Sequence, residues 1–256
     1  TDVVSVGTLT DREEAARLLA KYDLLALPVL DGEERMVGIV TVDDAMDVLT
    51  EAAAEDLSIM AAVTPDEKPY FAASAWEHAR HRVVWLLILM LSAAITGSII
   101  TRYEDAISAV PLLVAFLPML MDTGGNSGSQ ACVSIIRGIS LNEIEFRDLG
   151  RVVWKEIRVS VLCGVCLAIA CFAKIIVVDM LLLKSESVTY LVAFVVCATM
   201  AVTVCLAKIV GSTLPLLAKK LGFDPAVMAS PIITTIVDFL SLLVYFAFAT
   251  AMLGIG

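Results

Sequence analysis

Residues 83–100 read VVWLLILMLSAAITGSII, a run of 18 side chains without a charge. At a rise of about 1.5 Å per residue, an apolar helix of this length crosses most of the roughly 30 Å hydrocarbon core of a bilayer. Four further apolar segments follow, at residues 107–136, 159–178, 188–210 and 226–254. The sequence therefore predicts a mainly helical fold with a five-span transmembrane domain over residues 83–256, in contact with the lipid bilayer.

Composition separates this membrane domain from an acidic N-terminal part. Of the 256 residues, 59% are apolar, against roughly 45–50% in soluble domains, and the mean hydropathy is +0.88. Residues 1–69 carry 16 acidic and 5 basic side chains, whereas residues 70–256 carry 12 and 13. This pattern excludes a disordered chain, a small disulfide scaffold and a plain soluble enzyme. Lysine and arginine do not cluster as nucleic-acid binding requires, so we expect no nucleic-acid partner.

The basic residues alternate between the loops and predict an orientation. Nine lie before the first span, between spans two and three, and between spans four and five; only Arg102 and Lys184 lie on the other side. Because positive loops stay inside, we expect a cytoplasmic N-terminal domain and an outward-facing C-terminus in the cell (inner) membrane. The chain starts at Thr1 without an initiator methionine, so we expect it to be part of a longer protein.

Residues 1–63 predict a small α/β domain with the order β-α-β-β-α. A capping box from Thr10 to Glu13 predicts the start of its first helix, and Asp31-Gly32 predicts a hairpin turn. Residues 38–44, GIVTVDD, resemble the end of a CBS motif, which we expect to be the second of a pair. The resemblance implies nucleotide binding, with ATP as the expected ligand, through Thr41 and Asp44. The alternative is that these two residues only cap the next helix. We expect residues 64–82 to form a connecting or plug helix.

Four carboxylates recur along the predicted helix after residue 41, at intervals of three, four and four residues: Asp44, Asp47, Glu51 and Glu55. This spacing places them on one helical face, where like charges repel each other. One interpretation is a solvated acidic face. The other is a low-affinity divalent-cation site, since hard cations bind carboxylate oxygens.

Asp238 lies within an apolar span, about 18 Å along a helix from Ala226. An ionised carboxylate at that depth costs about 2.5–3.5 kcal/mol on insertion scales. Ser230, Thr234 and Asp238 share one helical face, and Asp122, Asn126 and Gln130 repeat the same spacing in the second span. Two polar stripes with two acids predict the lining of a cation path. The alternatives for the two acids are a helix end or a lysine partner.

Other chemistry is not indicated. Gly124 and Gly128 form a G-x-x-x-G pattern that permits close helix approach. The pair Cys163 and Cys166 lies in an apolar stretch without a second pair or a nearby histidine, so we expect it only to pack as small apolar residues. The sequence contains neither a phosphate loop nor a Ser/His/Asp set, and we predict that the chain is not an enzyme.

Residues 118–130, PMLMDTGGNSGSQ, resemble the second-helix motif of the MgtE family of magnesium channels, and residues 224–238 resemble its fifth helix. The resemblance implies a homodimer with the ion path between these helices. It implies a hydrated Mg²⁺ held by Asp238, assisted by backbone oxygens at Ser230 and Thr234. The family often has Asn where this chain has Ser230. The remaining residues implied to line the path are Asp122, Gly125, Asn126, Gln130 and Thr235.

The resemblance also implies that the acidic stripe holds regulatory Mg²⁺. The predicted function is thus Mg²⁺ transport down its electrochemical gradient, gated by cytoplasmic Mg²⁺, with Co²⁺, Ni²⁺ and Mn²⁺ as alternative ions. One alternative is a proton-coupled divalent-cation carrier. The other is a membrane-anchored Mg²⁺ or nucleotide sensor that transports nothing.

Overall fold

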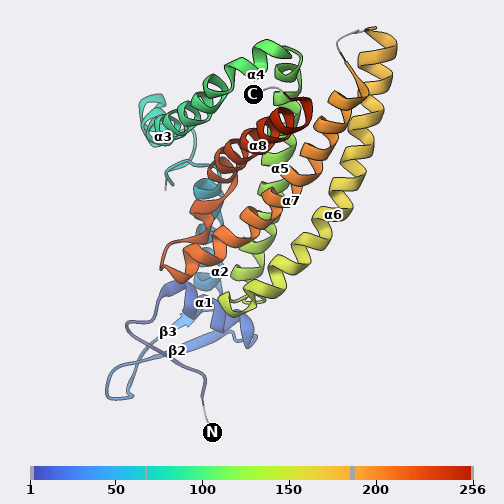
Figure 1. The fold of residues 1–256 in the computed structure, drawn as a ribbon. Coiled ribbons are helices and arrows are strands. Elements are labelled where there is room, and N and C mark those ends of the chain that lie inside the picture. The colour runs from blue at the N-terminus through green and yellow to red at the C-terminus, as the bar shows by residue number, and fades with distance from the viewer. Residues whose placement is uncertain (1–2, 67, 185–187, 255–256) are drawn as a thin grey trace. The chain divides into compact units, whose positions relative to one another are not determined.

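The structure is a computed structural model that describes residues 3–66, 68–184 and 188–254. The chain divides after Ile59 into two compact units (Figure 1). The first unit has the predicted order of strands and helices. Its elements are β1 (Val6–Gly7), α1 (Arg12–Lys21), β2 (Ala26–Leu30), β3 (Met36–Thr41) and the long α2 (Val42–Met60).

The three strands form one sheet in the order β1-β2-β3, with β1 parallel and β3 antiparallel to β2. Leu27 pairs with Val40 in the β2–β3 hairpin, whose turn is held by the Asp31 side chain, as the Asp31-Gly32 signal predicts. The small core of the unit is built from the apolar sides of β1, β2, α1 and α2: Val6, Ala15, Ala16, Leu19, Leu27 and Ala45.

The start of α1 differs from the predicted capping box. Asp11, not Thr10, is the N-cap residue, and its carboxylate accepts from the backbone N–H groups of Glu13 and Glu14. The Thr10 hydroxyl accepts instead from the backbone N–H of Gly7. The helix starts one residue later than predicted, because the Asp11 carboxylate reaches the free amides of the first turn and Thr10 is used by the preceding turn.

The second unit contains the membrane helices, and all five predicted spans fall on helical segments. They are α3 (Ala75–Arg102), the short α4 (Glu104–Ala109), α5 (Leu113–Ser140), the 3-10 turn η1 (Phe146–Asp148), α6 (Leu149–Lys174), the π-helical segment η2 (Ile175–Leu182), α7 (Tyr190–Lys220), the 3-10 turn η3 (Pro225–Met228) and α8 (Ser230–Leu253). Four helical stretches in the described residues are long and apolar enough to cross a membrane, and they contain α3, α6, α7 and α8. The 28-residue α5 is not among them, and it carries the polar stripe.

Over the described residues of the range 64–82, no separate connecting helix forms. The described residues between α2 and Ser74 are turns and irregular chain, and α3 begins at Ala75. Ser74 and Glu77 form a capping box at this start, and Lys68 pairs with Glu77 at 2.6 Å. The capping signal for a new helix therefore lies inside the expected connector, and residues 75–82 are the first turns of the first span.

Helix α5 lies at the centre of the second unit, packed against both α7 and α8, while α6 packs mainly on α7 (Figure 1). The ends of the helices are joined by specific contacts. The buried Tyr245 hydroxyl of α8 donates to the backbone carbonyl of Leu113 at 3.0 Å. The next residue, Phe246, stacks on Tyr103 with ring centres 4.7 Å apart. These contacts fix the start of α5 and the end of α3 on α8.

A candidate cation path between α5 and α8

Glycines let α5 approach its two neighbours closely. A Cβ atom on Gly124 would lie 2.7 Å from a methyl carbon of Thr203 on α7 and 2.9 Å from the hydroxyl oxygen of Ser241 on α8. On Gly128 it would lie 2.8 Å from Ile233 of α8. The close helix approach predicted from the G-x-x-x-G pattern is confirmed, and it brings the polar faces of α5 and α8 together.

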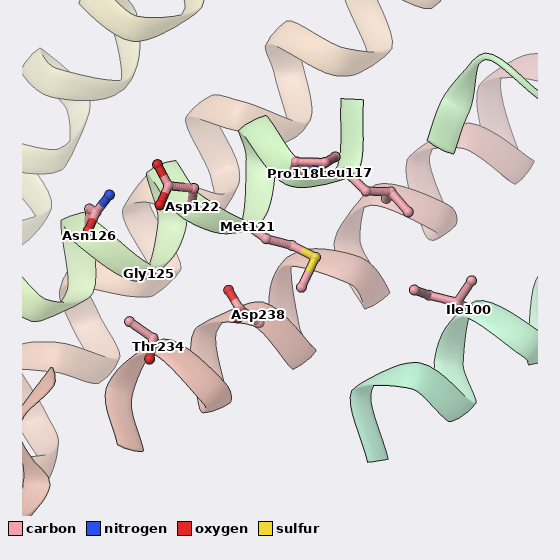
Figure 2. A pocket seen from close by; sticks show the side chains of 9 residues that line it. All are labelled: Ile100, Leu117, Pro118, Met121, Asp122, Gly125, Asn126, Thr234 and Asp238. Atoms are coloured by element: carbon pink, nitrogen blue, oxygen red, sulfur yellow. The ribbon is translucent and has the colours of Figure 1, made fainter. Parts of the chain in front are cut away.

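Beside these contacts lies a cavity of about 440 Å³, shown in Figure 2. Asp122, Gly125 and Asn126 line it from α5, and Thr234 and Asp238 line it from α8. Five of the residues predicted for the path thus share one cavity. Its apolar wall was not predicted and comes from the end of α3 and the first turns of α5: Ile100, Leu117, Pro118 and Met121. Of these, only the α5 residues lie in or beside the quoted motif.

Two predicted residues, Gln130 and Thr235, lie outside the cavity, and a third is not described. Gln130 is exposed on α5, one turn beyond Asn126, and does not line the cavity. Thr235 does not line it either, and its hydroxyl donates to the Pro231 carbonyl at 2.9 Å. The side chain of Ser230 lies outside the described residues. The roles of these three residues therefore stay predictions.

The two acids of the cavity have no cationic partner among the residues that the structure describes. Asp122 is exposed and Asp238 is partly buried. In the part of the chain that the structure describes, neither carboxylate has a lysine, arginine or histidine nitrogen within 4.0 Å. Lys174, one of the lysines near a span end, pairs instead with Asp179 at 2.8 Å. Among the described residues, the lysine-pairing alternative therefore does not apply to either acid.

The cavity has the size and chemistry for a hydrated divalent cation. Carboxylate, amide and hydroxyl oxygens are the groups that bind hard cations. The Thr234 hydroxyl donates to the Pro231 carbonyl at 2.9 Å, so its lone pairs remain available to accept. Six waters at about 30 Å³ each need roughly 180 Å³, well below the cavity volume of about 440 Å³. An ion that keeps its water shell therefore fits between the two helices.

The acidic stripe of α2 is less organised. All four carboxylates, Asp44, Asp47, Glu51 and Glu55, are on the surface of the helix. Glu51 pairs with Arg12 at 3.2 Å, and Asp44 accepts a hydrogen bond from the Thr41 hydroxyl at 2.6 Å. Hydrogen bonding to Thr41, and then to its own backbone amide, lowers the pKa of the neighbouring Asp43. Among the described residues, no three His, Cys, Asp or Glu side chains converge as a metal site.

Together these features define a multi-pass membrane protein with a cavity between two of its helices, lined by two carboxylates and an apolar wall, and an α/β unit of CBS type. A family model described as a divalent cation transporter, MgtE, matches residues 117–248. A CBS domain model matches residues 1–51. The chain therefore belongs to the MgtE family, as its two membrane motifs predicted.

Three relatives bear the same name, magnesium transporter MgtE. The protein from Thermus thermophilus is 39% identical over 251 residues, covering 98% of this chain and 54% of that protein. The Bacillus subtilis protein is 38% identical over 257 residues, covering 99% and 54%. The Enterococcus faecalis protein is 33% identical over 248 residues, covering 97% and 52%. The chain spans about half the length of these relatives. All three are named as transporters, in agreement with the prediction that the chain is not an enzyme.

Proposed function

We propose that this chain carries Mg²⁺ across a membrane along the cavity between α5 and α8. The observation that carries the proposal is the pair of carboxylates, Asp122 and Asp238, that line one cavity of a membrane bundle without a cationic partner in the described chain. An intramembrane acid is costly, and it faces a protein interior or a water-filled path. Mg²⁺ is proposed as the ion because the relatives are named magnesium transporters.

The proposed path holds Mg²⁺ with most of its water shell. Mg²⁺ dehydrates reluctantly and is usually bound through one or two carboxylates. Asp238 is the main ligand in this proposal, and backbone oxygens at Ser230 and Thr234 assist it. Asp122 and Asn126 meet the water shell from α5. Co²⁺, Ni²⁺ and Mn²⁺ are the competing ions, because they also accept oxygen ligands in octahedral geometry.

We also propose that the path is completed by a second copy of the chain. Asp122, Asn126 and Gln130 are exposed along one face of α5. Hydrocarbon cannot hydrogen-bond to these groups, so in a membrane this face needs protein or water against it. A homodimer that meets at α5 and α8 covers the face and brings two Asp238 carboxylates to one path.

Gating is assigned to the acidic unit, with the N-terminus in the cytoplasm and the C-terminus outside. At low cytoplasmic Mg²⁺ the carboxylates of α2 repel each other across the dimer, and the path opens. At high Mg²⁺ the bound ions neutralise the carboxylates, and the path closes. ATP at Thr41 and Asp44 is a further proposed ligand of this unit. In the described chain, the Thr41 hydroxyl donates a hydrogen bond to the Asp44 carboxylate.

The transport test compares Asp238→Asn with Glu143→Gln in liposomes. The first change removes the charge in the cavity and keeps the shape, while Glu143 is an exposed acid in the α5–α6 loop. We expect Asp238→Asn to lower Mg²⁺ uptake at least about tenfold, since a direct carboxylate ligand is lost. Glu143→Gln should keep the wild-type rate. Equal uptake by both variants would show that the ion takes another route.

The gating test uses a double variant, Asp47→Asn/Glu55→Gln, with Glu33→Gln as a control outside α2. Mg²⁺ is added on the side that carries the N-terminus. We expect it to suppress uptake by the wild type and the control but not by the double variant. Unchanged suppression in the double variant would assign the regulation to other residues.

A further inference from the structure

A second surface of the membrane unit lies on α6, away from the cavity. Seven exposed residues recur along this helix at intervals of four, three, four, three, four and three, which places them on one face. The face begins with three cations and continues with apolar side chains: Arg151, Lys155, Arg158, Leu162, Val165, Ile169 and Phe172. Helix α6 packs mainly on α7, so this face lies at the periphery of the bundle (Figure 1).

An apolar groove of about 300 Å³ lies beside this face, between α6 and α7. Gly164 forms part of its floor, because it has no side chain and a Cβ atom there would lie only 3.4 Å from Ala201 Cα. Val161 and Val165 of α6 and Val202 of α7 line its sides, and all three are exposed. Ser160, the first residue that lines the groove, comes two residues after Arg158, about 3 Å along the helix, so the groove starts within one turn of a cation.

The cations at this end of the groove are largely uncompensated. Arg151 reaches Asp148 only at 3.6 Å, and its side chain stays 91% exposed. Among the ion pairs of the described residues, none includes Lys155 or Arg158, although Glu156 lies between them in the sequence. The Arg158 guanidinium lies 6.0 Å from the ring centre of the exposed Trp154. Tryptophan beside basic residues at the end of a span is typical of the headgroup level of a membrane.

We propose that this surface binds an anionic glycerophospholipid. Arg158 and Lys155 hold the phosphate, Arg151 adds charge at the edge, and one acyl chain lies along the groove between α6 and α7. Basic residues next to a span select anionic headgroups. The apolar walls that continue directly from these cations fit a ligand with a charged head and a long hydrocarbon chain. A soluble phosphate compound would leave the groove empty.

Trp154 is a natural reporter for this site, since the chain has only two other tryptophans, Trp76 and Trp85. The test uses the full chain with Trp76→Phe and Trp85→Phe, reconstituted in phosphatidylcholine vesicles. A fraction of the lipid is brominated phosphatidylglycerol or, in parallel, brominated phosphatidylcholine of the same chain length. Bromine quenches tryptophan fluorescence at short range, so the ratio of the two quenching curves gives the relative affinity for the anionic lipid.

We expect phosphatidylglycerol to bind the surface beside Trp154 several-fold more strongly than phosphatidylcholine does. Arg158→Gln and Lys155→Gln should each lower the ratio of the two affinities by about fivefold, or bring it to one where the parent ratio is smaller than that. The reason is the electrostatic contribution of each basic residue near a charged surface. Arg137→Gln, which removes a cation at the end of α5, is the matched control and should keep the preference. Equal quenching by both lipids in the parent protein, or a preference that survives the double change Arg158→Gln/Lys155→Gln, would overturn the proposal.

The acyl-chain part is tested separately. Cys205 lines the groove and Cys166 is exposed on α6 outside it. Cys205→Phe should fill the groove and reduce quenching by lipids brominated along the chain, whereas Cys166→Phe should leave it unchanged. A large excess of inorganic phosphate in the buffer should not relieve the quenching. Relief by phosphate would assign the cations to a soluble anion in place of a lipid headgroup. Equal quenching in the two cysteine variants would show that no acyl chain occupies the groove.

Discussion

Gly211 of α7 provides a direct test of how α5 is held. A Cβ atom on this residue would lie 2.2 Å from the carbonyl oxygen of Gly128, 3.0 Å from its carbonyl carbon and 3.2 Å from its Cα. Ordinary contact begins near 3.4 Å. All three atoms belong to the backbone of α5, so no side-chain rotation can relieve the overlap. Gly211→Ala must therefore push the two helices apart by roughly 1 Å.

The expected cost follows from this displacement. Overpacking of a well-packed interior costs about 1–3 kcal/mol. For a chain of this size, each kcal/mol lowers the melting temperature by about 2–4 °C, so we expect a drop of roughly 5 °C. Helix α5 also carries Asp122 and Asn126, which move with its backbone. Because a shift of about 1 Å can abolish a precise constellation of ligands, we expect Mg²⁺ uptake to fall about tenfold or more.

The measurements are the melting temperature of the purified protein in detergent and Mg²⁺ uptake into liposomes. The matched control is Gly150→Ala on α6, where a Cβ atom meets nothing within 4 Å. The control should match the wild type or gain slightly, since alanine favours a helix over glycine. If Gly211→Ala melted and transported like the control, the close contact with Gly128 could not be what positions α5.

Three further changes test other contacts. Lys174→Met leaves Asp179, whose side chain is only 13% exposed, without its partner. We expect the free energy of unfolding to fall by about 1–3 kcal/mol and to be mostly recovered in Lys174→Met/Asp179→Leu. A double variant no more stable than the single one would argue against the ion pair. Tyr245→Phe removes the hydroxyl that holds the first carbonyl of α5, so the melting temperature should fall by a few degrees for about 1–2 kcal/mol with ion selectivity unchanged. Asp11→Ala removes the N-cap of α1 and should speed amide hydrogen exchange in that helix about fivefold. Thr10→Ala should have a smaller effect. A larger effect of Thr10→Ala than of Asp11→Ala would show that Thr10 is the N-cap, as the sequence predicted.

The membrane helices could be predicted from sequence because the length of an apolar run is a direct physical requirement of the bilayer. The interruptions within these helices were harder to predict from the sequence. The predicted segment 107–136 is divided by irregular chain around Pro111 into α4 and α5, as a residue that cannot continue a helix requires. The π-helical segment after Lys174 has no hydropathy signal. A lysine and an aspartate five residues apart, Lys174 and Asp179, are the feature that could have indicated it.

The site was predictable as far as it depends on one helix. The four-residue spacing of Asp122 and Asn126, and of Thr234 and Asp238, places each pair on one face, and the structure brings both pairs to one cavity. The remaining wall could not be predicted, because it depends on how separate helices cross. Ile100 of α3 reaches the cavity only through the packing of α3 on α8.

The low hydropathy of α5 follows from its position. This helix packs against α7 and α8 through glycines, so positions such as Gly124 and Gly128 cannot carry the large apolar side chains that raise hydropathy. Its next face lines the cavity and carries Asp122 and Asn126. Both requirements remove apolar side chains from the same two turns. Helix α7 also packs against α5 and α8 and still meets the length and hydropathy criterion, so the small and polar side chains of α5, not enclosure by protein alone, set this helix apart. Beyond its three cations, the exposed face of α6 has the opposite composition, with the apolar side chains Leu162, Val165, Ile169 and Phe172.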